Sequence, residues 1–411
     1  MRCAPPAGRG FSPLDEELAL RPGRYSPYLQ QCVVRLGTWL PFEQVPEALA
    51  WFTRVSASRE TARRLTERAG AALVAQETAL VEQLEQRWPE PAVPLTLHQL
   101  SVDGAMVPLL HGEWAEVKTL AIGRVERRRG EPHATELSYF SRLADADTFG
   151  RLAWVETHRR GLTLAPRVCA LVDGADWCQT FITRHCPDAV RILDFPHAAG
   201  YVSAAAQAMF GPGTADASGW LGPQLHSLKH DDPARVLAAL RARPVAESLT
   251  PETAAAQRDT AVAYLEARLR QIQYAQFRAA GYPIGSGIVE SANKLVVEAR
   301  LKGSGMHWAR ANVNPMVALR AAACSDRWTE SWARIWARWG AERQARSQAR
   351  RPAVPPAPSS PPPSGVDRAT ARRTVARLRV GRGTAGRPAP DHPWRKRLLR
   401  PRPTEPAPAK T

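Results

Sequence analysis

The spacing of apolar residues divides the chain into regions of different kinds. Over residues 24–88 apolar residues recur with the period of a helix, and over 97–340 short β-branched runs alternate with helical segments. Prolines mark residues 89–96 as a linker, and residues 1–23 precede the first periodic segment. From 341 to 411 proline and arginine replace the apolar pattern. The sequence therefore predicts a helical N-terminal domain, an α/β core and an unstructured tail.

The helical N-terminal region has the outline of a helix-turn-helix. One helix is expected to begin at Pro41, and Ser58 is a predicted N-cap for a second helix. That second helix directs Arg59, Arg63 and Arg64 away from its apolar face. An ordinary helical hairpin with a solvated arginine face fits the same pattern, so DNA contact through these arginines is a hypothesis.

The order of elements in the core predicts an RNase H-like α/β fold. Three strands, a helix, a strand, a helix and a strand are expected at Leu97–Val102, Val117–Val125, Leu137–Leu143, Ala146–Arg160, Arg167–Val172, Trp177–His185 and Val190–Leu193. A helical insertion is expected over about 200–280, and its clearest helix runs from Thr250 to Gly281. Ligands of such sheets gather at the carboxyl ends of the strands.

Three carboxylates stand at chemically suggestive positions in this core. Asp103 and Asp173 end two of the predicted strands, and Glu290 lies in the first turn of a helix opened by the glycine-rich run 285–287. Such carboxylates can hold two Mg²⁺ ions, with Mn²⁺ as a substitute, around a phosphodiester in cleavage and strand transfer. Asp103 suits the bridging position because it leaves the central strand. Each motif alone is weak, since an Asp-Gly pair is usually a turn; the ordered set of three is more specific.

Residues beside these motifs have alternative roles. Asp194 can serve as a further acidic ligand, and His197 as a structural partner or a general acid or base; the structural role is favoured because two-metal catalysis needs no histidine. Lys294 can form an ion pair with Glu290, four residues earlier, or reach a DNA phosphate.

A basic surface is expected to continue after this helix. Arg300 and Lys302 would extend it, and Trp308 could stack on a base, although a place in the core is favoured for this tryptophan. DNA is therefore the expected partner of this part of the chain.

Charge supports an acidic polymer as the partner. The formal net charge is +17, and residues 341–411 hold 17 of the 56 lysines and arginines against four acidic residues. Such a tail can be both a solvated disordered segment and a phosphate-binding arm. No apolar run has the roughly 18 residues of a membrane span, and the first residues lack a signal core, so a cytoplasmic protein without a membrane partner is expected. The six scattered cysteines predict reduced thiols, not a disulfide framework.

The motifs around the carboxylates resemble those of DDE transposases of bacterial insertion sequences, of the ISKra type. The resemblance covers most of residues 11–335 and is strongest over 282–291. It also rests on Asp103-Gly104, Gly112-Glu113-Trp114, Glu116-Val117-Lys118, Asp173-Gly174-Ala175-Asp176-Trp177, Ile192-Leu193-Asp194-Phe195, Arg300-Leu301-Lys302 and Trp308. Asn293 and His307 stand where the family pattern has cysteine and arginine.

The resemblance implies an RNase H-like core that depends on Mg²⁺. It implies Asp103, Asp173 and Glu290 as the catalytic triad, and DNA cleavage and strand transfer at terminal inverted repeats as the activity. By analogy with DDE enzymes, at least a homodimer is expected on DNA.

Two other functions fit the same residues. A structure-specific RNase H-like nuclease would cut branched DNA and join nothing. A transposase-derived DNA-binding protein would bind DNA without cutting it. The sequence holds no Gly-x-Ser-x-Gly, His-Glu-x-x-His or nucleotide P-loop motif, so the common hydrolase and nucleotide-binding classes have no support.

Overall fold

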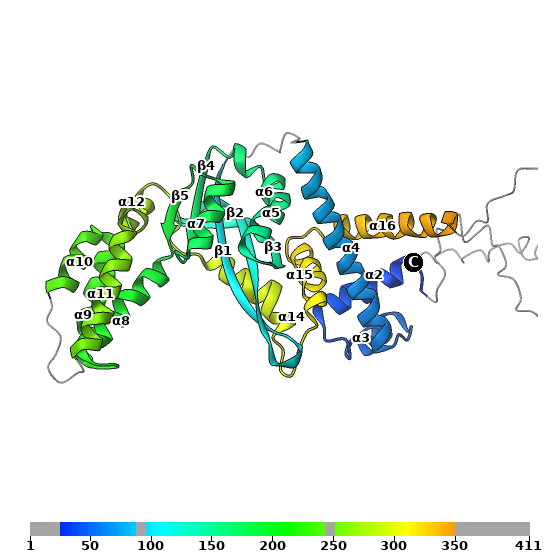
Figure 1. The fold of residues 1–411 in the computed structure, drawn as a ribbon, viewed down its shortest axis with the longest axis horizontal. Coiled ribbons are helices and arrows are strands. Elements are labelled where there is room, and N and C mark those ends of the chain that lie inside the picture. Colours follow the sequence, from blue (N-terminus) through cyan, green and yellow to red (C-terminus); the bar gives the residue numbers. More distant parts are fainter. Residues whose placement is uncertain (1–24, 88–95, 243–250, 350–411) are drawn as a thin grey trace, which may run out of the picture. The chain divides into compact units, whose positions relative to one another are not determined.

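One five-stranded sheet organises the part of the chain that the structure describes. The computed structural model describes residues 25–87, 96–242 and 251–349 (Figure 1). The strands, in the spatial order β3-β2-β1-β4-β5, are β1 (Leu97–Pro108), β2 (Trp114–Arg128), β3 (Glu131–Leu143), β4 (Arg167–Val172) and β5 (Val190–Leu193). The first three pair antiparallel, and β4 and β5 run parallel to β1. The predicted α/β class and order of elements in the core are confirmed.

The first strands are longer than predicted. β1 continues to Pro108 because Ala105 and Val107, at alternate positions, are buried. β2 and β3 are joined by Arg129 and Gly130, whose φ angles are 52° and 85°. Two central residues with positive φ are what a tight two-residue hairpin connection requires.

Helices cover both faces of the sheet, because successive side chains of a strand point to opposite faces. One face packs against α5 (Ala146–Leu152), α6 (Trp154–Arg159) and α7 (Asp176–His185). The other packs against α13 (Gly287–Ala292), the π-helical segment η4 (Asn293–Glu298), α14 (Ala299–Leu301) and α15 (Arg310–Cys324). The second face therefore carries the glutamate motif.

The predicted helical insertion lies between β5 and the glutamate motif. It comprises α8 (Phe195–Phe210), α9 (Ala215–His230), α10 (Pro233–Ala242), α11 (Pro251–Ala267) and α12 (Tyr274–Ala279). Its apolar residues share one core with Leu171 of β4 and Ile192 of β5. The expectation of one helix from Thr250 to Gly281 is wrong, since α11 ends at Ala267 and a 3-10 turn separates it from α12. Leu265 of α11 and Ile272, which follows the 3-10 turn, are both buried.

Three helices, α2 (Pro27–Trp39), α3 (Val45–Thr53) and α4 (Arg59–Gln86), form the described part of the N-terminal region. Ser58 is the N-cap of α4 as predicted, because its hydroxyl accepts the Thr61 N–H at 3.1 Å. The helix expected to begin at Pro41 begins instead at Val45. α4 shares a core with α15 and α16 (Trp328–Ala349).

The predicted tail begins too early. The expectation of unstructured chain from residue 341 is wrong up to 349, because α16 continues to Ala349. Residues 350–411 lie outside the described residues, as do segment 1–23 and nearly all of linker 89–96. None of the described helices combines the length and apolarity needed to cross a membrane.

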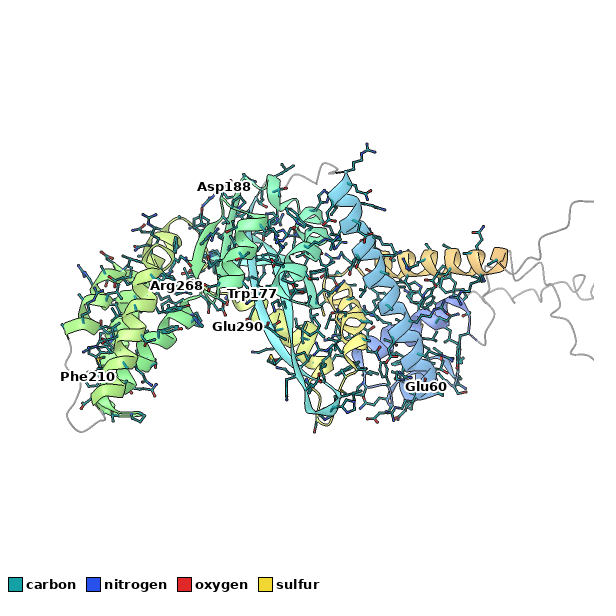
Figure 2. All side chains as sticks on the ribbon, viewed as in Figure 1. Glu60, Trp177, Asp188, Phe210, Arg268 and Glu290 are labelled. Carbon is teal, nitrogen blue, oxygen red and sulfur yellow. The ribbon has the colours of Figure 1, made fainter. Side chains whose placement is uncertain are left out.

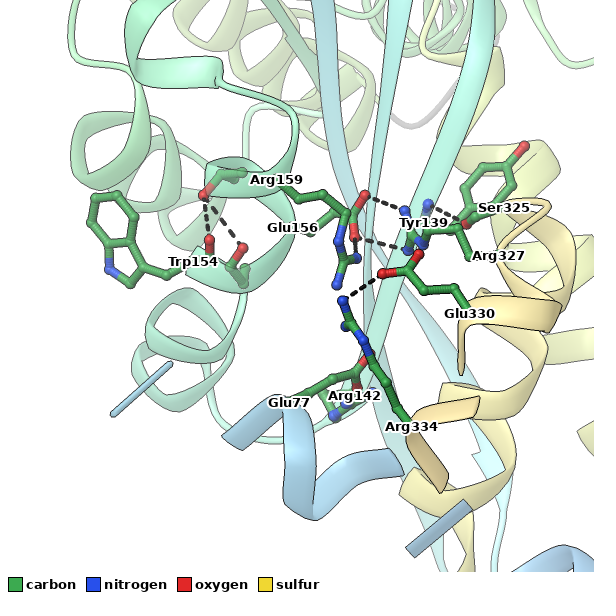
Figure 3. A network of polar contacts seen from close by, with 12 residues as sticks. Glu77, Tyr139, Arg142, Trp154, Glu156, Arg159, Ser325, Arg327, Glu330 and Arg334 are labelled. Atoms are coloured by element: carbon green, nitrogen blue, oxygen red, sulfur yellow. Dashed lines mark hydrogen bonds and ion pairs between the residues drawn. The ribbon is translucent and has the colours of Figure 1, made fainter. Parts of the chain in front are cut away.

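A buried ion cluster joins the sheet's helical cover to the start of α16 (Figure 3). Glu156 of α6 is fully buried and accepts two hydrogen bonds from Arg327, at 2.8 and 2.9 Å, and one from Arg159 at 2.7 Å. Burial alone would raise the pKa of Glu156, but the charges of Arg327 and Arg159 outweigh it and lower the pKa. The carboxylate is therefore ionised in the folded protein.

We predict that Glu156→Gln destabilises the protein at neutral pH by about 3–5 kcal/mol, because it leaves the half-buried guanidinium groups of Arg327 and Arg159 without their counter-charge. Since the folded-state pKa of Glu156 is lowered, its contribution is present above the unfolded-state pKa and is lost as pH falls through the folded-state value. Urea denaturation at several pH values should thus show that acidification lowers the free energy of unfolding less in Glu156→Gln than in the parent protein.

Glu330→Gln is the matched control for this experiment. Glu330 pairs with Arg334 on the surface of α16, with side chains 49% and 44% exposed (Figure 3). An exposed pair contributes less than about 1 kcal/mol. Equal losses in the two variants would contradict the assigned importance of the Glu156 cluster.

Candidate active site

Parallel pairing brings the predicted aspartates to neighbouring positions. Leu100 of β1 pairs with Ala170 of β4, and three residues further along these chains stand Asp103 and Asp173. By the same rule, the pairing of β4 with β5 brings Asp194 next to Asp173. Residues aligned on parallel strands point to the same face of a sheet, so three acidic side chains share one region.

Asp103 lies inside β1. The prediction that it ends its strand is wrong, because β1 continues and Asp103 pairs with Thr119 of β2. Its carboxylate accepts the Gly104 N–H at 2.7 Å and the Asn293 amide at 2.8 Å. Burial raises the pKa of Asp103, and the negative charges of Asp173 and Glu290 raise it further, against these two hydrogen bonds. The three predicted carboxylates therefore interact electrostatically.

Asp173 follows β4 directly, as predicted. One carboxylate oxygen accepts the Ala175 N–H at 3.0 Å and the Cys178 thiol at 3.5 Å. Burial and the charge of Asp173 raise the pKa of Cys178, which keeps the thiol protonated and able to donate. These contacts leave the second oxygen of Asp173 without a hydrogen-bond partner among the described residues.

The helical insertion holds the backbone on which Asp173 stands. The Tyr264 hydroxyl donates to the Asp173 carbonyl at 2.6 Å, and the Arg268 guanidinium donates to the Gly174 carbonyl at 3.0 Å. Burial raises the pKa of Tyr264 to about 12, so this hydroxyl is protonated at neutral pH. Gly174 has φ 87°, and a Cβ there would lie 2.4 Å from the Tyr264 oxygen. Glycine is therefore required by both the backbone conformation and the close approach.

Asp194 has a structural role in this geometry. It caps α8, accepting the His197 N–H at 3.3 Å, and its other oxygen accepts the Ser286 N–H at 2.6 Å. It is 5% exposed. Because both oxygens are engaged, the contacts favour a role in fixing the loop before Glu290 over that of a metal ligand.

Glu290 occupies the first turn of α13, as predicted, and its side chain is exposed. The π-helical segment η4 follows directly and carries Asn293, which donates to Asp103. One-turn π-helical insertions occur often at functional sites. Glu290 has no hydrogen-bond or ion-pair partner among the described residues, so no such contact holds its side chain away from the aspartates. Figure 2 labels Glu290 together with Trp177 of α7 and Arg268, which follows α11.

The donor set suits Mg²⁺, but the carboxylates are not closely grouped. Hard carboxylate oxygens are the ligands that Mg²⁺ prefers. A cation would favour the ionised form of Asp103, whose pKa is raised mainly by burial and further by the charges of Asp173 and Glu290. Within the described ranges, no three His, Cys, Asp or Glu side chains lie close enough together to hold one ion. The residue types therefore fit the ion, whereas the side-chain positions do not form a completed site.

Sequence reasoning did not single out Glu116 as a site residue. A Cβ on Gly104 would lie 2.0 Å from the Glu116 carboxylate, so this side chain passes directly over the backbone next to Asp103. Glu116 pairs with Lys118, whose ammonium lies 5.3 Å from the centre of the Trp177 ring. The alternation of side chains along β2 could have indicated this residue from the sequence, because it puts Glu116 and Lys118 on one face of the strand.

The structure divides the predicted DNA-binding residues of this region into exposed and buried ones. Lys294 is exposed, and the ion pair with Glu290 does not form. Lys302 is exposed and pairs with Glu298 at 2.7 Å. Arg300 is 2% exposed, so the prediction that it extends an exposed basic surface is wrong. Trp308 is 7% exposed, which confirms the place in the core favoured for it over stacking on a base.

Arg300 and Trp308 instead belong to the core. The Arg300 guanidinium stacks on Phe42 and Trp308, with 4.7 and 5.1 Å to the ring centres, and burial lowers its pKa to about 10. The Trp308 indole donates to the Leu301 carbonyl at 3.2 Å. Cation–π contact satisfies a buried guanidinium where no carboxylate is near.

The three predicted DNA-binding arginines of α4 differ in whether they are paired with carboxylates. Arg59 and Arg64 are exposed, whereas Arg63 pairs with Glu60 and Glu67 at 2.7 and 2.9 Å.

His197 contacts the rings of Tyr201 and Tyr264, whose centres lie 5.5 and 6.0 Å from the centre of its own ring. The aromatic contacts of His197 favour its structural role.

No protein-family model matches this chain, and no curated protein matches it either.

We predict that Gly174→Ala destabilises the protein more than Gly213→Ala. Both glycines have positive φ, 87° and 73°, but a Cβ on Gly213 would meet no atom within 4 Å. The backbone penalty of about 1–2 kcal/mol is common to both, and overpacking against Tyr264 adds about 1–3 kcal/mol at Gly174. Urea denaturation measures the difference.

The double variant Gly174→Ala/Tyr264→Phe tests the cause. Removing the hydroxyl nearest to the added Cβ should recover part of the loss. Equal losses of unfolding free energy in Gly174→Ala and Gly213→Ala would show that the close approach of Tyr264 to Gly174 does not contribute.

Proposed function

We propose that this chain is a Mg²⁺-dependent DDE transposase that cuts and joins DNA at the terminal inverted repeats of an insertion sequence. The observation that carries the proposal is the alignment of Asp103 with Asp173 on parallel strands, with Asn293, three residues after Glu290, donating to Asp103 at 2.8 Å. The motifs of the resemblance contain these same three residues.

The sheet supports an RNase H-like core. Its order β3-β2-β1-β4-β5, with an antiparallel meander followed by two parallel strands, is the arrangement expected of that fold. The active edge lies at the carboxyl ends of β4 and β5, where α/β sheets bind ligands.

Asp103, Asp173 and Glu290 would hold two Mg²⁺ ions, which supply charge stabilisation for the attacking and leaving oxygens of the phosphodiester. The chain's own residues prepare these ligands. The Asn293 amide and the Gly104 N–H favour the ionised form of Asp103, and the Cys178 thiol orients Asp173. Asp194 holds the loop that leads into the helix of Glu290.

DNA is the proposed partner, and the acting form is at least a homodimer on paired DNA ends. The net charge of +17 favours binding to a polyanion. The exposed cations Lys294, Arg59 and Arg64 are available to phosphates. A cytoplasmic, nucleoid-associated location follows from this partner.

We predict that Glu290→Gln abolishes DNA cleavage while leaving DNA binding intact. The substrate is a duplex that carries the sequence flanking the gene, incubated with Mg²⁺ or Mn²⁺. Cleavage should fall at least about 100-fold, the scale on which an enzyme loses rate when one group that stabilises transition-state charge is removed. Gel analysis of end-labelled strands measures cleavage, and fluorescence anisotropy measures binding.

Glu298→Gln provides the control, since Glu298 lies on the same helical stretch and pairs with Lys302. Cleavage unaffected by Glu290→Gln would refute its role. Binding without cleavage by the folded parent protein would indicate the inactive DNA-binding relative. Cleavage of branched DNA without joining would indicate the structure-specific nuclease.

We further predict that Asn293→Ala moves the pH dependence of cleavage. The Asn293 amide stabilises ionised Asp103, so its removal raises the pKa of Asp103. The acidic limb of the rate–pH profile should shift to higher pH. Asn312→Ala, which removes an amide bonded to Glu67 at 2.8 Å, should leave the limb in place. An unshifted acidic limb in Asn293→Ala would show that the ionisation of Asp103 does not set the pH dependence of the cleavage rate.

A further inference from the structure

Three successive arginines stand at the tip of the β2–β3 hairpin, with the Arg127 guanidinium beside Gly281. Arg127, Arg128 and Arg129 are all exposed, and Gly130 completes the turn. This run lies far along the chain from the predicted helix-turn-helix and from the glutamate helix. Its charge is not part of the site described above.

The carboxylates of this hairpin are engaged by other arginines. Arg124 pairs with Glu126 and with Glu136, the latter at 2.9 Å. Glu131, directly across the ladder from Arg128, pairs with Arg278 of α12 at 3.1 Å. Among the described residues, the three tip arginines therefore have no carboxylate within ion-pair distance.

The turn itself holds an arginine where the backbone disfavours one. Arg129 has φ 52°, in the left-handed region that asparagine and glycine occupy most readily. Asn-Gly is the preferred pair for such a connection, and adjacent like charges repel. Fold stability alone thus favours other residues here, which indicates that the arginines have an external partner.

We propose that the hairpin tip formed by Arg127, Arg128 and Arg129 binds the phosphate backbone of duplex DNA. Guanidinium groups bind phosphate oxygens in a bidentate manner, and such contacts position a protein without reading base sequence. This inference rests on the proposed function for the identity of its partner, since an acidic protein would offer carboxylates of similar charge.

The strand gives the spacing between this contact and the cut. Asp103 pairs with Thr119 of β2, and Arg128 follows Thr119 on the same strand by nine residues. At about 3.4 Å per residue the separation is roughly 30 Å. That distance corresponds to about nine base pairs. The tip therefore binds DNA about one helical turn from the cleaved bond.

The test compares two triple variants of equal charge in the full chain. Arg127→Gln/Arg128→Gln/Arg129→Asn removes the tip charges. Arg151→Gln/Arg241→Gln/Arg334→Gln removes three exposed arginines that pair with Glu85, Glu266 and Glu330. The probe is a fluorescent 40-base-pair duplex of the gene's flanking sequence, measured by anisotropy without divalent ions so that no strand is cut.

We predict that the tip variant binds the duplex at least about tenfold more weakly than the control variant at 0.15 M salt. The plot of log affinity against log salt should flatten by about 0.9 for each lost phosphate contact. Shortening the duplex by about one turn on the side that meets the tip should remove the difference between the variants.

The single variant Arg129→Asn separates a loss of DNA affinity from a loss of stability. It should melt at the same temperature as the parent or higher, because asparagine suits the turn, while it binds the duplex more weakly. Loss of binding with a lowered melting temperature would overturn the assignment.

Other outcomes separate this inference from the proposed function. Equal affinity and salt dependence in the two triple variants would overturn the tip contact, whether or not the protein cuts DNA. Polyglutamate that competes as well as DNA of equal charge would also overturn it, in favour of an acidic protein partner. A tip-dependent DNA affinity in a protein that never cuts would uphold the contact and reject the transposase.

Discussion

The parallel pairing of β1 with β4 is the constraint on which the candidate site depends. A shift of one residue in this register would turn Asp173 to the opposite face from Asp103. Buried residues on both faces of the strands, such as Leu100 and Leu171, fix the register. Burial raises the pKa of Asp103, and the negative charges of Asp173 and Glu290 raise it further. The buried register of the sheet therefore keeps Asp103 and Asp173 on one face although their like charges disfavour it.

The helical insertion stabilises this arrangement from outside the sheet. Stacked rings of Tyr201 and Tyr264, 3.9 Å apart, join α8 to α11. Tyr264 of α11 binds the Asp173 backbone, and Asp194, the N-cap of α8, binds the loop before Glu290. The insertion and its N-cap thus position elements of the candidate site.

Positively charged side chains in the described part of this protein fall into a buried and an exposed group. Buried arginines such as Arg142 and Arg300 stabilise the fold through a carboxylate or aromatic rings. The exposed cations at Lys294 and at the hairpin tip, which have no ion-pair partner in the described part of the chain, are the ones that the proposed DNA contacts would use. Net charge alone predicts a polyanionic partner but does not distinguish these groups.

Local periodicity and capping were sufficient to predict the α/β class, the order of elements in the core, the N-cap at Ser58 and the position of Glu290 in the first turn of its helix. The sequence also predicted the three carboxylates, whose catalytic role stays a prediction. The burial of Arg300, the contact of Asp194 with Ser286 and the contacts of Asn293 and Tyr264 with the two aspartates could be found only in the folded chain. These contacts join residues far apart in the chain, and their partners are chosen by packing that no local pattern encodes.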